Sequence, residues 1–278
     1  MKNIIINYNN ISKMDSNTFY GKRGKEFKTL IQDILRKGNL RAEYIDLITD
    51  EEGMRLYSQA FTDSSVDEKN NYEVLEFLGD STVNNSVVWY LFRRFPQLNC
   101  PEGVKVLARL KINLVSKERY YRFASGLNFW NYISADISIR STKRKSLMED
   151  VFEAFFGATE KLLDERIRPG IGHHICYNIV SSIYDELDIS LRYQDLFDAK
   201  TRLKEIGDAF PEIGKFKYVS EKKGKFQYVK IYIGGRQLGE GVASIKPDAE
   251  QKAANEAILK LDKQGFSKPI PEFYLQFC

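Results

Sequence analysis

Residues 72–81 read Tyr-Glu-Val-Leu-Glu-Phe-Leu-Gly-Asp-Ser, and this stretch decides how the rest of the chain is interpreted. On a helix, Glu73, Glu76 and Asp80 occupy positions i, i+3 and i+7, so their carboxylates share one face. Like charges stacked in this way repel, and no Lys or Arg lies among them as on an ordinary solvated face. The stretch therefore predicts a helix that gathers negative charge for a chemical purpose.

A second stretch repeats this theme: residues 146–158 read Ser-Leu-Met-Glu-Asp-Val-Phe-Glu-Ala-Phe-Phe-Gly-Ala. Asp150 and Glu153 are neighbours on one helix face, beside aromatic and small residues. Two helices that each offer two oxygen ligands can assemble a site for Mg²⁺ or Mn²⁺. Such a site suits phosphoryl transfer. Either acidic pair alone is commonplace on protein surfaces, so the interpretation depends on both helices meeting.

The composition excludes several classes of protein. The chain has 278 residues, 43% of them hydrophobic and 13% aromatic, which argues against disorder. No apolar run approaches the roughly 18 residues that a membrane span needs, so we expect no membrane partner. Cys100, Cys176 and Cys278 are odd in number and far apart, which argues against a disulfide framework or a Cys-based zinc site. We expect an intracellular, cytoplasmic protein.

Two folding patterns follow one another along the chain. Up to about residue 190 apolar residues recur with the helical period, as in Leu75, Leu78, Val83 and Val87, and strand-like alternation is almost absent. This part is predicted to be all-helical. The remainder predicts an α-β-β-β-α order, with two helices and three strands separated by glycine turns. The expected elements are a helix over 195–206, strands over 216–219, 226–233 and 237–244, and a helix over 248–261.

The acidic stretches resemble the signature helices of the ribonuclease III family, which residues 75–81 and 149–154 match in order and spacing. Residues 107–116 are similar to the family's intervening helix. Residues 60–65, Ala-Phe-Thr-Asp-Ser-Ser, resemble a segment that ordinarily reads Ala-Leu-Thr-His-Arg-Ser. The resemblance covers about residues 25–190.

This resemblance implies a homodimeric endoribonuclease that hydrolyses double-stranded RNA with Mg²⁺, or Mn²⁺ as a substitute. The implied products carry 5′-phosphate and 3′-hydroxyl ends with short 3′ overhangs. The residues that carry these roles by correspondence are the catalytic and metal-binding Glu76, Asp80, Asp150 and Glu153, the auxiliary Glu73, and Phe77, which the family inserts into the partner subunit.

Three further correspondences concern packing and substrate contacts. Gly79 sits where helices of the family approach closely. Asp63 and Ser64 stand where the family has His and Arg, and these departures bear on RNA contacts or helix packing.

The C-terminal part resembles a double-stranded RNA-binding domain. Residues 198–205 match its first helix, and residues 239–254 match the run into its second helix. A Pro at position 247 replaces a Lys usual in the family, and the first hairpin is short. The RNA contacts implied are Thr201, Lys204, Glu205 and Lys246, with Lys252 as a further candidate.

The predicted organisation is therefore a ribonuclease III-like domain followed by an RNA-binding domain. A non-catalytic RNA-binding scaffold, for example a ribosome-associated protein, is the alternative, and the presence of all four acids favours the enzyme. Residues 273–277 are apolar enough to dock somewhere, and the sequence does not identify the surface. The expected segments are an N-terminal extension 1–22, a catalytic domain 23–190, an RNA-binding domain 193–264 and a tail 265–278.

Overall fold

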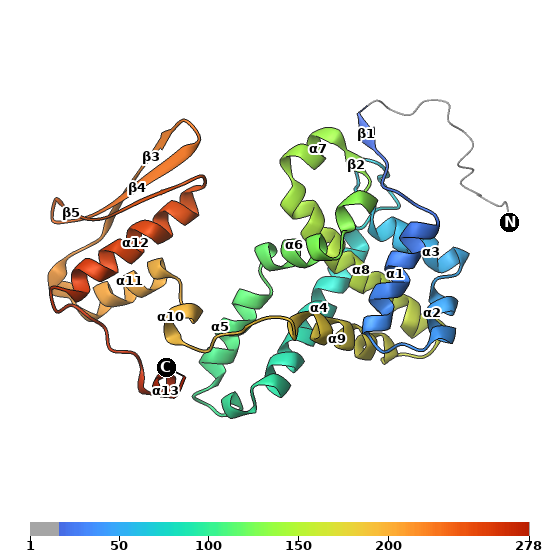
Figure 1. Cartoon of the computed structure of the whole chain (residues 1–278), viewed down its shortest axis with the longest axis horizontal. Helices are drawn as coiled ribbons and strands as arrows, with labels where there is room; N and C mark the ends of the chain where they lie inside the picture. The colour runs from blue at the N-terminus through green and yellow to red at the C-terminus, as the bar shows by residue number, and fades with distance from the viewer. Residues whose placement is uncertain (1–16, 278) are drawn as a thin grey trace. The chain divides into compact units, whose positions relative to one another are not determined.

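The computed structural model describes residues 17–277 and divides the chain into two compact units (Figure 1). The first unit contains the described residues up to Asn99 together with Leu110–Asp188. The second contains Cys100–Arg109 and the residues from Ile189 on. No helix within residues 17–277 is both long enough and apolar enough to cross a bilayer.

The first unit is built almost entirely of helices, as predicted. Its one short ladder pairs β1 (Thr18–Phe19) with β2 (Ala135–Asp136) in antiparallel fashion. Two-residue strands have no alternation for a sequence pattern to reveal, so they were not expected. Two 3₁₀ turns lie at Pro96–Leu98 and Phe129–Tyr132, and α5 (Val104–Leu114) is divided between the two units. The other helices of the first unit are α1 (Lys25–Lys37), α2 (Ala42–Ile48), α3 (Glu51–Ala60), α4 (Glu73–Arg94), α6 (Lys117–Gly126), α7 (Ile137–Thr142), α8 (Arg144–Arg166) and α9 (Ile171–Tyr184).

Helix α8 is the central element of this unit and packs against α4, α6 and α9. Every residue from Val151 to Thr159 is buried, so this helix is apolar nearly all round, as a helix inside a core must be. The exception in that run is Glu153, a carboxyl group held inside the core. Burial of a carboxyl costs free energy, which marks this part of α8 for a purpose other than packing.

Two glycines let α4 and α8 cross closely. A Cβ on Gly79 would lie 1.8 Å from the backbone oxygen of Glu153, and one on Gly157 would lie 2.0 Å from that of Leu75. Any side chain at either position would force the helices apart. The expectation that Gly79 marks a close approach is thereby confirmed, and Gly157 is its counterpart on the facing helix.

The second unit has the predicted α-β-β-β-α order. Strands β3 (Lys217–Lys223), β4 (Phe226–Ile233) and β5 (Arg236–Ala243) form an antiparallel sheet in that order. Helix α12 (Lys246–Asp262) packs against β4 and β5, and α11 (Ala199–Ala209) packs against α12. Gly239 and Gly241 allow this contact, since a Cβ on either would lie 2.1 Å from a backbone oxygen of α12.

The predicted bounds of two elements here were wrong. The helix expected over 195–206 is interrupted: α10 (Tyr193–Leu196) ends at extended Phe197, and α11 begins after Asp198, whose side chain accepts from the Thr201 backbone and caps the helix. The strand expected over 216–219 continues to Lys223, because its exposed, lysine-rich end still pairs with β4. Such pairing leaves no apolar signal in the sequence.

The C-terminal tail docks within the second unit, as its apolar residues predicted. Helix α13 (Glu272–Leu275) buries Tyr274, which is 6% exposed. Its ring lies 5.2 Å from that of Tyr193 and 6.0 Å from that of Phe197, centroid to centroid. The tail thus covers the segment that leads into α11.

Candidate active site

The crossing of α4 and α8 brings the two predicted acidic pairs together. Glu153 of α8 is 8% exposed, and its carboxyl group is hydrogen-bonded with that of Asp80 from α4. Glu76 of α4 interacts electrostatically with Asp150 of α8 and also with Glu153. We refer to Glu76, Asp80, Asp150 and Glu153 as the acidic centre. Its residues lie far apart in the sequence and meet only because the helices cross.

Burial makes three of these carboxyl groups unusually weak acids. It raises the pKa of Glu153 to about 9, with Asp80 and other nearby acids adding to the effect. Burial and the neighbouring Asp150 raise the pKa of Glu76 to about 7. The pKa of Asp150 rises to about 6, chiefly through burial, although a hydrogen bond from Tyr72 opposes the rise. The acidic centre therefore holds protons near neutral pH unless a cation replaces them.

One cationic side chain is paired with this region. Lys117, the first residue of α6, forms an ion pair with Glu149 of α8, and the pairing raises the Lys117 pKa. Lys117 also interacts electrostatically with Asp150 and Glu153. Neither Lys117 nor Glu149 was predicted as a site residue. Glu149 lies beside Asp150 in the sequence, so the motif itself could have suggested it, whereas no pattern pointed to Lys117.

A buried tyrosine contacts the other edge of the acidic centre. The Tyr72 hydroxyl lies 3.1 Å from Oδ2 of Asp150 and 3.0 Å from Oδ2 of Asp63. Burial, together with the charges of Asp150 and Asp63, raises the pKa of Tyr72, so it is a phenol and not a phenolate. No role was predicted for Tyr72 from the sequence. Asp63 was expected to bear on RNA contacts or helix packing and not on the acidic centre.

The donor chemistry of the acidic centre fits a hard divalent cation. All four side chains are carboxylates, the ligands that Mg²⁺ and Mn²⁺ prefer, and their negative charge exceeds what Lys117 can balance. No three His, Cys, Asp or Glu side chains within residues 17–277 are arranged as they would be around a bound ion.

The other residues predicted in this unit lie on the outer side of α4. Glu73 is exposed at the start of the helix, outside the buried part of the acidic centre. Phe77 is 84% exposed and Val74 is 75% exposed, and Trp89 and Phe92 are further exposed apolar residues toward the end of the same helix. We call these four apolar residues the α4 outer face. An apolar surface of this kind on a helix indicates a contact with another molecule.

The predicted RNA contacts lie in the second unit and are of two kinds. Lys204, Lys246 and Lys252 are exposed. Thr201 is half-buried, and its hydroxyl donates to Asp198. The carboxylate of Glu205 accepts a hydrogen bond from the Tyr193 hydroxyl and is also paired with Lys268, 3.0 Å away. Glu205 is thus already engaged by groups from α10 and from the tail.

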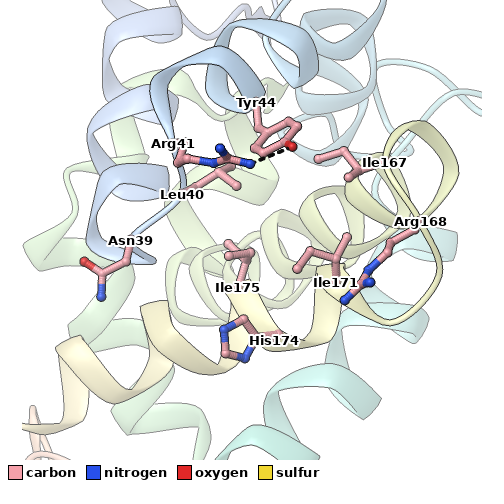
Figure 2. Close-up of a pocket in the computed structure, with 9 residues that line it drawn as sticks. All are labelled: Asn39, Leu40, Arg41, Tyr44, Ile167, Arg168, Ile171, His174 and Ile175. Atoms are coloured by element: carbon pink, nitrogen blue, oxygen red, sulfur yellow. Dashed lines mark hydrogen bonds between the residues drawn. The ribbon is translucent and has the colours of Figure 1, made fainter.

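A separate cavity of about 410 Å³ lies in the first unit, between the start of α2 and the start of α9 (Figure 2). Arg41 and Arg168 lie at its edge, and the Arg41 guanidinium donates to the Tyr44 hydroxyl across 2.8 Å. Isoleucine side chains line much of the remainder. None of the four acids lines it, so this cavity is not part of the candidate active site.

Comparisons with known proteins identify what this chain is similar to. Residues 73–160 match the ribonuclease III domain, and residues 199–261 match the double-stranded RNA binding motif. A protein of Invertebrate iridescent virus 6 is 39% identical over 97% of this chain and 99% of its own length. Ribonuclease 3 of Lactobacillus johnsonii is 33% identical over 81% of this chain and 96% of its own length. The nuclease domain of ribonuclease III from Campylobacter jejuni is 24% identical, with a TM-score of 0.43, over 57% of this chain and 99% of its own.

These matches define the class of protein as a ribonuclease that carries a double-stranded RNA-binding domain. The chain belongs to the ribonuclease III family.

Proposed function

We propose that this protein is an endoribonuclease that cleaves double-stranded RNA by metal-dependent phosphodiester hydrolysis. The observation that carries the proposal is the convergence of acids from α4 and α8 at a crossing that two glycines permit. The products would have 5′-phosphate and 3′-hydroxyl ends with short 3′ overhangs. RNA processing in the cytoplasm is the role that this chemistry serves.

The proposed roles follow from charge and position. Glu76, Asp80, Asp150 and Glu153 would hold Mg²⁺, or Mn²⁺ in its place, which when bound supplies an activated water and neutralises charge on the phosphate. Lys117 balances part of the negative charge that would otherwise repel RNA. The Glu153 carboxyl, whose pKa is about 9, holds a proton at neutral pH until a cation displaces it. Glu73 is an auxiliary acid at the exposed edge.

We also propose that the protein acts as a homodimer through the α4 outer face. Exposed Phe77 and Val74 would be buried against a second copy, which removes apolar surface from water. Twofold symmetry then supplies two acidic centres, one for each strand of the duplex. This support is physical: a single centre can serve only one strand at a time.

Substrate binding is assigned to the second unit. Lys204, Lys246 and Lys252 are exposed and can meet phosphates, and Thr201 is placed on the same helix as Lys204. Glu205 would contact a minor groove only after leaving its present partners. The proposed segment bounds remain 1–22, 23–190, 193–264 and 265–278.

The test is cleavage of a long, perfectly paired RNA in Mg²⁺ by the wild type and by Glu153→Gln. We expect products from the wild type and at least a 100-fold loss of rate in the variant, with duplex binding retained. Glu165→Gln is the matched control, because Glu165 is an exposed acid on the same helix and pairs with Lys161. Tight binding without cleavage by the wild type in Mg²⁺ or Mn²⁺ would instead support a scaffold.

A further inference from the structure

Asp63 is a buried acid outside the predicted acidic centre. It lies between α3 and α4 and is 6% exposed. A buried carboxyl group is costly unless it is hydrogen-bonded and has a purpose. The ribonuclease III family ordinarily has His at this position. The free-energy cost of burying a carboxyl group here is therefore a feature of this chain.

The contacts of Asp63 connect it to the acidic centre through one side chain. Its Oδ2 lies 3.0 Å from the Tyr72 hydroxyl, and that hydroxyl lies 3.1 Å from Oδ2 of Asp150. Oδ1 of Asp63 accepts from the backbone N–H of Ser65 at 2.9 Å. Both Asp63 oxygens are therefore occupied, and the connection to Asp150 passes through the tyrosine.

The backbone fixes both members of this connection. The Asp63 N–H donates to the backbone oxygen of Ser134 at 2.9 Å, and the Tyr72 N–H donates to that of Thr62 at 2.9 Å. Tyr72 is itself 7% exposed, so its ring has little freedom to move. A rigid donor of this kind is what a carboxylate needs if it is to keep one orientation.

A phenol carries one proton but contacts two carboxylates here. It can donate fully to Asp150, fully to Asp63, or share the hydrogen between them. Because Asp63 is a second acceptor, the Tyr72 hydroxyl always has a partner, which avoids the penalty of a buried unsatisfied donor. Tyr72 engages one oxygen of Asp150, so the other oxygen remains available to a cation.

We propose that Asp63 and Tyr72 form a positioning relay, in which Asp63 orients Tyr72 and Tyr72 holds Asp150 in place for a divalent cation. The relay rests on the proposed function, since it needs Asp150 to be a ligand. Neither relay residue need touch the RNA or the cation.

The test is Mn²⁺ binding by the full chain, measured without RNA from the electron paramagnetic resonance signal of free Mn²⁺. Tyr72→Phe removes only the hydroxyl, and we expect affinity to fall about 10-fold, as for other residues that orient metal ligands. Tyr90→Phe is the matched control. The Tyr90 hydroxyl donates to Asp185 over 3.1 Å, and neither residue belongs to the acidic centre. The control should bind Mn²⁺ like the wild type, and melting curves report whether each variant is folded.

A double variant tests the order of the relay. Asp63→Asn keeps an oxygen that can accept from Tyr72 and removes the buried charge, so we expect a smaller loss than for Tyr72→Phe. If Asp63 acts only through Tyr72, the double variant Tyr72→Phe/Asp63→Asn should bind Mn²⁺ as Tyr72→Phe does. Losses that multiply would mean that Asp63 acts on the cation independently, which overturns the relay.

The remaining outcomes separate the relay from the proposed function. Wild-type affinity in Tyr72→Phe, together with weakened binding in Glu153→Gln, would overturn the relay alone. Equal Mn²⁺ binding by the wild type and Glu153→Gln would overturn the proposed metal centre and the relay with it.

Discussion

At the scale of single residues, the acidic centre is a place where burial and charge oppose one another. The Glu153 carboxyl lies in a run of core residues on α8, and its ionisation is disfavoured by burial and by Asp80. A group of this kind does not stabilise the fold when ionised. In the proposed metal centre, a bound cation would offset the cost of the charge.

The burial of the Glu153 carboxyl group predicts how the stability of the metal-free protein depends on pH. A glutamate loses its proton near pH 4.5 in the unfolded chain, whereas Glu153 keeps its proton to about pH 9 in the folded one. The folded state therefore binds more protons between these values, and the free energy of unfolding falls as pH rises through this range. We expect a loss of several kcal/mol from pH 5 to pH 9, measured by urea unfolding in chelator.

The control for this prediction is Glu153→Gln, which has no proton to lose and should flatten the pH dependence. Glu76 and Asp150 contribute in the same direction, with pKa values raised to about 7 and about 6, so a weaker slope should remain below neutral pH. A wild-type protein whose stability rose with pH over this range would contradict the prediction.

At the scale of elements, the decisive contact is the crossing of α4 and α8. Both helices present a glycine to the backbone of the other, Gly79 to that of Glu153 and Gly157 to that of Leu75. This close approach puts carboxylates from two helices within reach of one another. Glycines have the same role in the second unit, where Gly239 and Gly241 allow α12 to pack closely against the sheet.

Replacing either glycine at the helix crossing should therefore damage both stability and the acidic centre. We expect Gly157→Ala to lower the free energy of unfolding by about 2 kcal/mol or more, because a Cβ 2.0 Å from a backbone oxygen forces the helices apart. The measurement is thermal unfolding with Mn²⁺ binding on the same sample.

Gly126→Ala is the matched control for the crossing. Gly126 is the last residue of α6, and a Cβ there would have no atom within 4 Å. The added methyl group should leave stability unchanged or slightly raise it, because alanine restricts the unfolded chain more than glycine does. Equal melting temperatures for Gly157→Ala and Gly126→Ala would show that the crossing tolerates a side chain.

At the scale of the whole molecule, the exposed apolar surface of α4 is the feature that a single chain leaves unexplained. Val74 and Phe77 are more exposed than any other large apolar residues in the described part of the chain, and they lie within the acidic motif. In the proposed dimer, the same helix would carry the contact between copies on one face and the acids on another.

A charge on the α4 outer face should separate the copies. We expect Phe77→Asp to sediment as a monomer at concentrations where the wild type is a dimer, because a carboxylate cannot be buried unpaired in an apolar contact. Sedimentation velocity is the measurement. Leu259→Asp is the control, since Leu259 is an exposed apolar residue on α12 in the other unit. A monomeric wild type would contradict the proposed dimer.

The sequence alone determined that an all-helical unit precedes an α-β-β-β-α unit, and it predicted the four acids of the acidic centre. Those properties depend on local periodicity: the spacing of Glu76 and Asp80 puts both on one helix face whatever the rest of the chain does. The contact at Gly79 and the docking of the tail were also predictable, because an interior glycine and an exposed apolar segment each need a reason.

Only the tertiary structure decided which distant residues join the acidic centre. Lys117, Tyr72 and Asp63 lie on other elements or connections, and no periodicity relates them to Asp150. Likewise, the pairing of Glu205 with Lys268 follows from where the tail lies. Distances between such residues are set by how helices pack and connections run, which is a property of the folded chain and not of any local pattern.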